Sequence, residues 1–161
     1  MHRPRPQPAT TARHVWAYDF VFDACANGQQ LKCLTVIDEY TRECLAIDVA
    51  GSIRSGRVIE VLSRLVSLHG APRYLRSDNG PEFVSRAILK WTADESFNGK
   101  FRDECLSLEW FRTRTEAKVV IEQWRRHYNA IRPHSSLAYL TPNEFKQRYC
   151  STEATEAVLQ D

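Results

Sequence analysis

Two aspartates lie in strand-like stretches of the sequence where a carboxylate could do chemistry. Asp78 follows the lead-in Tyr74-Leu75 and precedes Asn79-Gly80-Pro81, a turn signal whose proline suits the first position of a helix. A carboxylate at the carboxyl end of a strand points into the crevice where open α/β sheets bind their ligands. Asp19 interrupts one apolar face of the stretch Val15 to Phe22, and a charge there costs stability unless it is paired or holds a cation. Both positions are therefore candidate functional sites.

A structural role competes with this interpretation for Asp78. Taken alone, Asp78 is equally well explained by capping the turn that follows it. Asp19 and a further carboxylate, Glu95, favour the functional role once the elements that carry them are placed in order. Asp23 directly follows the first strand and is expected to be a turn residue.

The composition indicates one compact domain with loose ends. The chain has 161 residues, of which 43% are hydrophobic and 26% are charged, and this is enough apolar material for a core. No apolar run approaches the roughly 18 residues of a membrane span, and the N-terminus lacks the apolar stretch of a signal peptide. We therefore expect a cytoplasmic protein without a membrane segment.

The cysteines and the charge further limit which kind of protein this sequence can be. The five cysteines are scattered and never form a C-x-x-C pair, so they indicate reduced core residues rather than a disulfide framework or a zinc site. The net charge is +2, and the basic excess lies before the acidic last residues. This permits a polyanion partner, although an ordinary solvated surface explains it as well. We expect a basic flexible arm at residues 1–13, a folded domain at 14–148 and an acidic disordered tail at 149–161.

The first part of the sequence predicts three strands that pair in order. Asn27-Gly28 is the strongest short hairpin signal, and it separates Val15 to Phe22 from the alternating stretch Leu31 to Ile37. A turn at Asp38 to Arg42 leads into a third strand, Cys44 to Val49. We expect these strands to form an antiparallel meander.

A helix and a crossover strand follow the meander. Ser55 is expected to cap a helix whose apolar residues recur at helical spacing up to His69-Gly70. Arg73 to Ser77 then returns as a strand, and the crossover places it parallel to the first strand. The result is an α/β protein with a mixed sheet flanked by helices. This β-β-β-α-β order, with carboxylates in the first and fourth strands, is that of a ribonuclease H-like fold.

The second half of the chain is predicted to be helical. Pro81 to Trp91 and Glu95 to Leu106 form two helices, Thr113 opens a third with a capping-box sequence, and Thr141 opens a short last one. Apolar stripes on the second and third helices are expected to be core rather than base-stacking platforms. Their members are Phe97, Phe101, Cys105, Ala117, Val120, Ile121, Trp124 and Tyr128.

Five motifs occur along the chain in a specific order. They are Trp16-Ala17-Tyr18-Asp19-Phe20, Asp38-Glu39-Tyr40-Thr41-Arg42, Ser77-Asp78-Asn79-Gly80-Pro81-Glu82-Phe83, Glu95-Ser96-Phe97-Asn98-Gly99-Lys100, and Tyr128-Asn129 through Arg132-Pro133-His134. Over about residues 14 to 146 they resemble the integrase core of bacterial insertion-sequence transposases, relatives of retroviral integrase.

The resemblance implies a D-D-E triad of Asp19, Asp78 and Glu95, which are both the catalytic residues and the metal ligands. Phosphodiester cleavage and transfer use two divalent cations about 3.5 to 4 Å apart. Mg²⁺, or Mn²⁺ in its place, prefers carboxylate oxygens and keeps several waters, so three acidic side chains suffice. The implied reaction is cleavage at the end of a mobile element, followed by attack of the freed 3′-hydroxyl on target DNA.

The implied partners are double-stranded DNA, both element ends and target, and further copies of the chain in a homo-oligomer. The expected location is the bacterial cytoplasm, in association with the nucleoid. Lys100, Arg102, Arg125 and Arg126 are candidates for phosphate contacts, which add affinity without reading sequence, and solvation is their alternative role. His134 matches a family position but has no metal partner at suitable spacing, so we expect it to be structural.

One segment departs from the family pattern. Only residues 79–94 separate Asp78 from Glu95, which is shorter than the family spacing and leaves no room for the family's fifth strand. At about 1.5 Å per helical residue, the link Thr92-Ala93-Asp94 is too short to reverse the chain and add a strand. We therefore expect Glu95 to lie away from the aspartates, with Asp94 or Glu82 as alternative third ligands. The family's upstream DNA-binding helices have no counterpart either, so the sequence resembles a truncated, internally deleted copy.

Three functions are compatible with these observations. The triad and its motifs favour an enzyme of DNA cleavage and strand transfer, impaired by the short segment before Glu95. The short segment and the basic arm favour a catalytically inactive fragment that binds DNA or multimerises. A nuclease of the ribonuclease H type is the third possibility, but it needs a fourth acidic ligand that nothing in the sequence marks.

Overall fold

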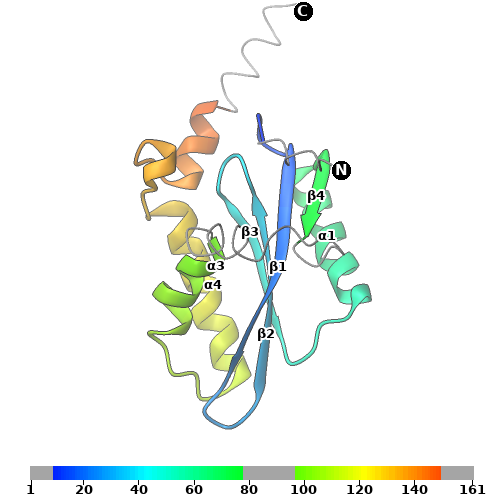
Figure 1. The fold of residues 1–161 in the computed structure, drawn as a ribbon, viewed down its shortest axis with the longest axis vertical. Coiled ribbons are helices and arrows are strands. Elements are labelled where there is room, and N and C mark those ends of the chain that lie inside the picture. Colours follow the sequence, from blue (N-terminus) through cyan, green and yellow to red (C-terminus); the bar gives the residue numbers. More distant parts are fainter. Residues whose placement is uncertain (1–8, 78–96, 150–161) are drawn as a thin grey trace, which may run out of the picture.

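A four-stranded mixed sheet is the centre of the fold (Figure 1), in a computed structural model that describes residues 9–77 and 97–149. β1 (Val15–Ala24), β2 (Gln30–Asp38) and β3 (Cys44–Ala50) pair antiparallel in sequence order. β4 (Tyr74–Ser77) pairs parallel with β1, so the spatial order is β3-β2-β1-β4. The predicted meander and the predicted parallel crossover strand are both confirmed.

The turn between β1 and β2 forms where the Asn-Gly pair predicts it. Gly28 has a φ of 85°, a left-handed conformation that glycine adopts without steric cost. The side-chain oxygen of Asn27 accepts the N–H of Gln29 at 3.0 Å. This turn fixes the register of the hairpin, in which Asp19 of β1 lies opposite Thr35 of β2.

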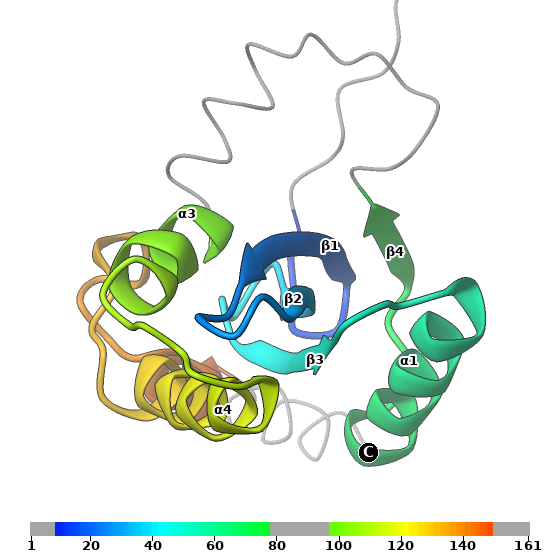
Figure 2. The ribbon, with the colours of Figure 1, turned by 90° about the horizontal axis from the view of Figure 1, so that it is seen from below.

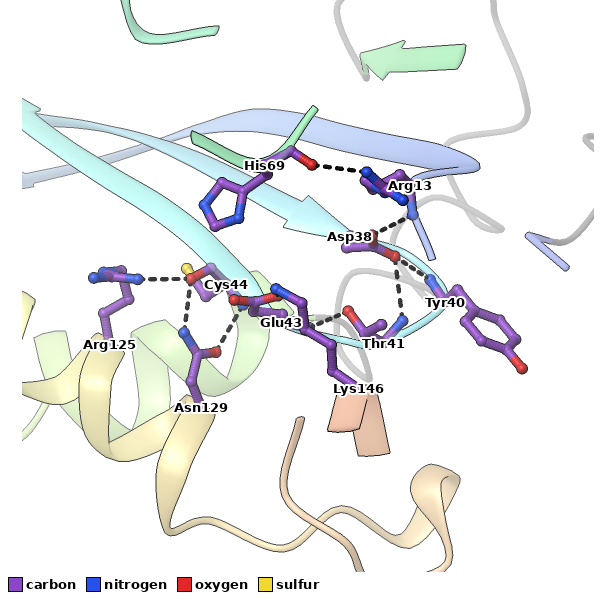
Figure 3. A network of polar contacts seen from close by, with 10 residues as sticks. All are labelled: Arg13, Asp38, Tyr40, Thr41, Glu43, Cys44, His69, Arg125, Asn129 and Lys146. Atoms are coloured by element: carbon purple, nitrogen blue, oxygen red, sulfur yellow. Dashed lines mark hydrogen bonds and ion pairs between the residues drawn. The ribbon is translucent and has the colours of Figure 1, made fainter. Parts of the chain in front are cut away.

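The turn between β2 and β3 is held by the buried carboxylate of Asp38, as Figure 3 shows. Its two oxygens accept the backbone N–H groups of Arg13 at 2.7 Å, Tyr40 at 2.9 Å and Thr41 at 3.2 Å. Arg42 then takes a positive φ of 62° before β3 begins. Asp38 therefore ties the segment before β1 to the β2–β3 turn.

One face of the sheet is covered by α1 (Ser55–His69), which lies beside β4 in Figures 1 and 2. Ser55 does not cap this helix, contrary to the sequence prediction. The cap position is Arg54, whose backbone is extended and whose side chain makes no capping bond, so Ser55 is already the first helical residue. The core on this side comprises Trp16, Leu34, Val36, Leu45, Ile53, Val61 and Leu65.

The opposite face is covered by α3 (Phe97–Phe101), the π-helical turn η1 (Arg102–Leu106) and α4 (Arg114–Ala130), as Figure 2 shows. The predicted stripe Phe97, Phe101 and Cys105 is buried. Trp124 and Tyr128 of α4 pack on Phe97 with ring centroids 5.4 and 4.8 Å apart. These rings are core, as predicted, rather than a base-stacking surface.

The last two α-helices begin close to the predicted positions, and each has capping hydrogen bonds at its start. The Thr113 hydroxyl accepts the N–H of Glu116 at 3.2 Å. The Glu116 carboxylate accepts the N–H of Arg112, rather than that of Thr113. After the short helix η2 (Ser135–Leu137), a reciprocal pair of bonds joins Thr141 and Glu144 at the start of the helix 142–149. Both helix starts are therefore confirmed.

The cysteines within the described residues are free and buried, as expected of reduced core residues. Burial raises the pKa of the Cys33 thiol to about 12, so it stays protonated at neutral pH. Within the same ranges, no helix is long and apolar enough to cross a membrane. The predicted helix Pro81 to Trp91, most of the arm and nearly all of the tail lie outside the described residues.

Candidate active site around Asp19

Asp19 lies in the middle of β1 and is partly buried, on the sheet face that α3 covers. Its Oδ1 accepts the backbone N–H of Phe20 at 2.7 Å. Its Oδ2 accepts the side-chain amide of Asn98, the second residue of α3, at 2.6 Å. Both oxygens of the carboxylate are thus held in defined directions by donors that carry no charge.

Asn98 is held in turn by Thr35, which lies opposite Asp19 on β2. The Thr35 hydroxyl donates to Asn98 Oδ1 at 3.0 Å, and the Thr35 side chain is 1% exposed. Sequence reasoning missed both residues as part of the site. A signal existed for Thr35, because the hairpin register set by Asn27-Gly28 already places this polar residue across from Asp19.

The parallel pairing of β4 with β1 leads toward Asp78. Ala17 pairs with Arg76 and Tyr18 pairs with Ser77, where the described ladder ends. Asp19 follows Tyr18 in β1, and Asp78 follows Ser77 in the sequence. Asp78 itself lies outside the described residues, so the prediction that the two carboxylates lie side by side stays a prediction.

Glu95 also lies outside the described residues, as do the alternative ligands Glu82 and Asp94. α3 begins at Phe97, two residues after Glu95. Within residues 9–77 and 97–149 alone, no group of three or more histidine, cysteine, aspartate or glutamate side chains could hold a metal ion. The third ligand therefore remains a sequence-based expectation.

An ion pair stands beside the β1–β4 ladder. The guanidinium of Arg76 donates to Glu39 at 2.8 Å, which joins β4 to the residue after β2. Burial raises the pKa of Glu39, although the positive charge of Arg76 acts in the opposite direction. The Glu39 carboxylate thus neutralises the positive charge of Arg76, which lies two residues before Asp78 in the sequence.

The basic residues predicted to contact DNA have different environments. Arg102 on η1 is exposed and Lys100 on α3 is partly buried. On α4, the Arg126 side chain is 75% exposed and bonds Glu122 at 3.3 Å. Arg125 instead bonds Glu122 at 2.6 Å and the carbonyl of Cys44 at 2.9 Å, which ties α4 to the start of β3 (Figure 3).

His134 is buried and packs edge-on against Tyr128, with ring centroids 4.6 Å apart. Burial lowers its pKa to about 4, so the imidazole is neutral at neutral pH. The neighbouring Arg132 forms an ion pair with Glu104 of η1. The loop after α4, which contains Arg132 and His134, therefore packs against α4 and η1. His134 occupies a packing position in this loop.

The sheet order and the helices on both faces give this chain a ribonuclease H-like fold, and solved integrase structures have a similar fold. The catalytic core of HTLV-2 integrase, solved in complex with magnesium, has a TM-score of 0.53 at 17% identity, over 83% of this chain and 94% of that one. A simian T-cell lymphotropic virus intasome solved by cryo-electron microscopy has a TM-score of 0.57 at 15% identity, over 90% of this chain and 58% of that one. At these identities the likeness concerns the fold alone.

Residues 9–101 and 93–142 match the integrase core domain, and the chain belongs to that family. Its relatives include an uncharacterised 39.2 kDa protein of insertion element IS476 from Xanthomonas euvesicatoria, 45% identical over 89% of this chain and 47% of the relative. An uncharacterised 31.7 kDa protein of insertion element IS407 from Burkholderia multivorans is 42% identical over 91% of this chain and 60% of the relative. The chain thus spans about half the length of these curated relatives.

Proposed function

We propose that this chain is the catalytic core of an insertion-element transposase that cleaves DNA and transfers the cut strand to target DNA. In this proposal Asp19, Asp78 and Glu95 are the ligand set for two Mg²⁺ or Mn²⁺ ions, and the short segment 79–94 impairs activity by limiting the reach of Glu95. The ions activate the attacking oxygen and stabilise the leaving oxygen of the phosphodiester. The family membership and the insertion-element relatives support this reaction class, and the geometry around β1 supports assigning it to these residues.

The parallel pairing of β1 and β4 carries this proposal. The ladder ends at Tyr18 and Ser77, and each of these residues is followed in the sequence by an aspartate. Continuing the ladder by one step supports placing the two carboxylates beside each other at the sheet's ligand-binding edge. Neighbouring carboxylates of like charge are costly unless a cation or a proton lies between them.

The environment of Asp19 fits a hard divalent cation. Carboxylate oxygen is the ligand that Mg²⁺ prefers, and an ionised carboxylate has about four lone-pair sites. The Phe20 and Asn98 bonds give the two oxygens defined directions.

Partners follow from the same proposal. We place double-stranded DNA across the carboxylate edge, with Lys100, Arg102 and Arg126 as phosphate contacts. Arg125 contributes less, because Glu122 and the Cys44 carbonyl already engage its guanidinium. We also propose a homo-oligomer in the bacterial cytoplasm, bound to the nucleoid, and the HTLV-2 core solved in a dimeric form supports an oligomer for such a fold.

A second candidate is a catalytically inactive fragment that binds DNA or multimerises. The alignments to the IS476 and IS407 proteins run over 162 and 166 positions, although they take in only 89% and 91% of a chain of 161 residues. Each alignment therefore includes positions that this chain lacks. The short segment 79–94 is the proposed site of that loss, and a displaced Glu95 is the proposed consequence.

A strand-transfer assay on labelled duplex ends separates the two candidates. The chain is incubated with Mg²⁺ or Mn²⁺, and Asp78→Asn serves as the control for contaminating nuclease. Metal-dependent products that disappear in Asp78→Asn support the enzyme. Binding of duplex DNA with no metal-dependent product supports the inactive fragment, and products that persist in Asp78→Asn contradict the assigned site.

A further inference from the structure

Thr35 carries a buried hydroxyl in the middle of β2, next to apolar residues. Its neighbours Cys33, Leu34 and Val36 are each 0% exposed, and Thr35 is 1% exposed. A buried hydroxyl needs a hydrogen-bond partner, and it has a single hydrogen to donate. The acceptors within reach are Asn98 Oδ1 at 3.0 Å and the Asp19 carbonyl at 3.4 Å, so the shorter bond to Asn98 is the better one.

This bond determines which way the Asn98 amide faces. An asparagine side chain has one acceptor oxygen and one donor nitrogen, on opposite sides of the group. With the oxygen satisfied by Thr35, the nitrogen faces Asp19 Oδ2 and donates to it at 2.6 Å. In the reversed orientation, two acceptor oxygens would face each other at Asp19, and the Thr35 hydroxyl would keep only its longer bond to the Asp19 carbonyl. The three residues therefore form a chain of bonds that joins β2, α3 and β1.

The carboxylate of Asp19 needs such a restraint. Rotation about the terminal bond of an aspartate is broad and has no sharp staggered minimum. The Phe20 N–H fixes Oδ1 and the Asn98 amide fixes Oδ2, so both oxygens point in set directions. A catalytic ligand must be held within about 0.5 Å of its productive position. Thr35 does this indirectly, through Asn98, and also ties the start of α3 to the centre of the sheet.

We propose that Thr35 is a positioning residue: through the Asn98 amide it fixes the orientation of the Asp19 carboxylate toward a divalent cation. The role toward a cation rests on the proposed function, whereas the bond chain itself does not. Residues that orient metal ligands typically change metal affinity by about 10- to 100-fold when they are replaced. Thr35 never touches the ion, the substrate or the reacting atoms.

Two substitutions distinguish positioning from simple packing. Thr35→Val keeps the shape of the side chain and removes the hydroxyl, whereas Thr35→Ser keeps the hydroxyl and removes a methyl group. A packing role predicts that valine is the better replacement, and a positioning role predicts serine. Thr41→Val is the matched control, because Thr41 is also 1% exposed but its hydroxyl accepts the N–H of Glu43 in the β2–β3 turn.

The test uses the side-chain amide signals of Asn98 in ¹H–¹⁵N NMR spectra of the full chain without metal, assigned by their loss in Asn98→Asp. We expect Thr35→Val to shift these signals and to increase their exchange with water by about tenfold or more. Thr35→Ser and Thr41→Val should leave them in place. Unchanged Asn98 signals in a folded Thr35→Val protein, or signals that serine fails to restore, would overturn the proposal.

A Mn²⁺ titration followed by electron paramagnetic resonance then tests the consequence for the cation. Thr35→Val should weaken Mn²⁺ binding by about tenfold, and Thr35→Ser should restore it. If the wild-type chain binds no Mn²⁺ while the Asn98 signals respond as expected, the bond chain is supported and the proposed function fails. If the wild-type chain binds Mn²⁺ and Thr35→Val binds it equally well, the positioning role fails and the proposed function stands.

Discussion

Two aspartates of the same sheet, Asp38 and Asp19, have different kinds of hydrogen-bond donors around their carboxylates. Asp38 is 3% exposed, and its carboxylate accepts three backbone N–H groups from the segment before β1 and from the β2–β3 turn (Figure 3). Asp19 is more exposed, and its partners include one backbone N–H and a side-chain amide from a distant helix. Backbone donors close a turn, whereas a side-chain donor from another element sets the orientation of a carboxylate.

The two aspartates also differ in whether their partners and proposed partners lie within the described residues. The bonds of Asp38 come from residues next to it in sequence and from Arg13, all within the described part. Asp19 stands at the end of the described β1–β4 ladder, and its proposed co-ligands Asp78 and Glu95 come from the segment 78–96. A change to that segment should therefore affect the Asp19 region and leave the Asp38 region intact.

The largest expected effect comes from lengthening the segment before Glu95. Inserting a family-length segment between Trp91 and Asp94 should raise metal-dependent DNA cleavage by about 100-fold or more, since a misplacement of 1 Å at an active site can cost that factor. In the unmodified chain, Glu95→Gln should change cleavage little. The measurement is product formed per hour from labelled duplex ends.

A matched control completes this experiment. Glu95→Gln in the lengthened chain should abolish the gained cleavage, because the glutamate then reaches the ions. A large loss of cleavage from Glu95→Gln in the unmodified chain would instead show that Glu95 already contacts the metals, and the proposed deletion effect would be wrong.

The second effect concerns stability and separates the two aspartates directly. Asp38→Ala leaves the N–H groups of Arg13, Tyr40 and Thr41 without their acceptor and should lower the free energy of unfolding by about 3 kcal/mol. Asp19→Ala should lower it by less than about 1 kcal/mol, because it also removes a charge from an apolar strand face. Urea unfolding curves measure both. Equal losses would mean that Asp19 is a structural residue like Asp38.

The smallest effects come from two adjacent arginines of α4. Arg125→Met should cost about 2 kcal/mol of stability, because it breaks bonds to Glu122 and to the Cys44 carbonyl. Arg126→Met should change stability by less than about 0.5 kcal/mol but should reduce the salt dependence of duplex binding by about one unit of slope. Salt titrations of DNA affinity test this. If Arg126→Met leaves the salt dependence unchanged, Arg126 does not contact phosphate.

Much of this fold could be predicted because its signals are local. Asn27-Gly28 fixes the hairpin and its register, and the helical spacing of Phe97, Phe101 and Cys105 marks their buried face. The helix start at Ser55 was misplaced by one residue, because a serine just inside a helix has the same sequence pattern as a serine that caps it. Local patterns thus determine the elements and leave their ends uncertain.

The candidate site was only partly predictable. A carboxylate in an apolar strand face marks Asp19, and the crossover order predicts the parallel neighbour that leads to Asp78. The bond from Asn98 to Asp19 joins residues 79 positions apart, and no sequence period encodes such a contact. The phosphate contact of Arg125 stays a prediction, and its bond to the Cys44 carbonyl could not be predicted, because a backbone group carries no sequence signal.

The assignment of Asp19 and Asp78 to one shared cation is tested most directly by paramagnetic broadening of NMR signals with Mn²⁺. In the wild-type chain, Mn²⁺ should broaden the backbone signals of Phe20 and Ser77 and the side-chain signals of Asn98 more strongly than those of Tyr40 and Thr41 near Asp38. Asp19→Asn and Asp78→Asn should each abolish this broadening. Broadening around Phe20 that persists in Asp78→Asn would contradict a shared site.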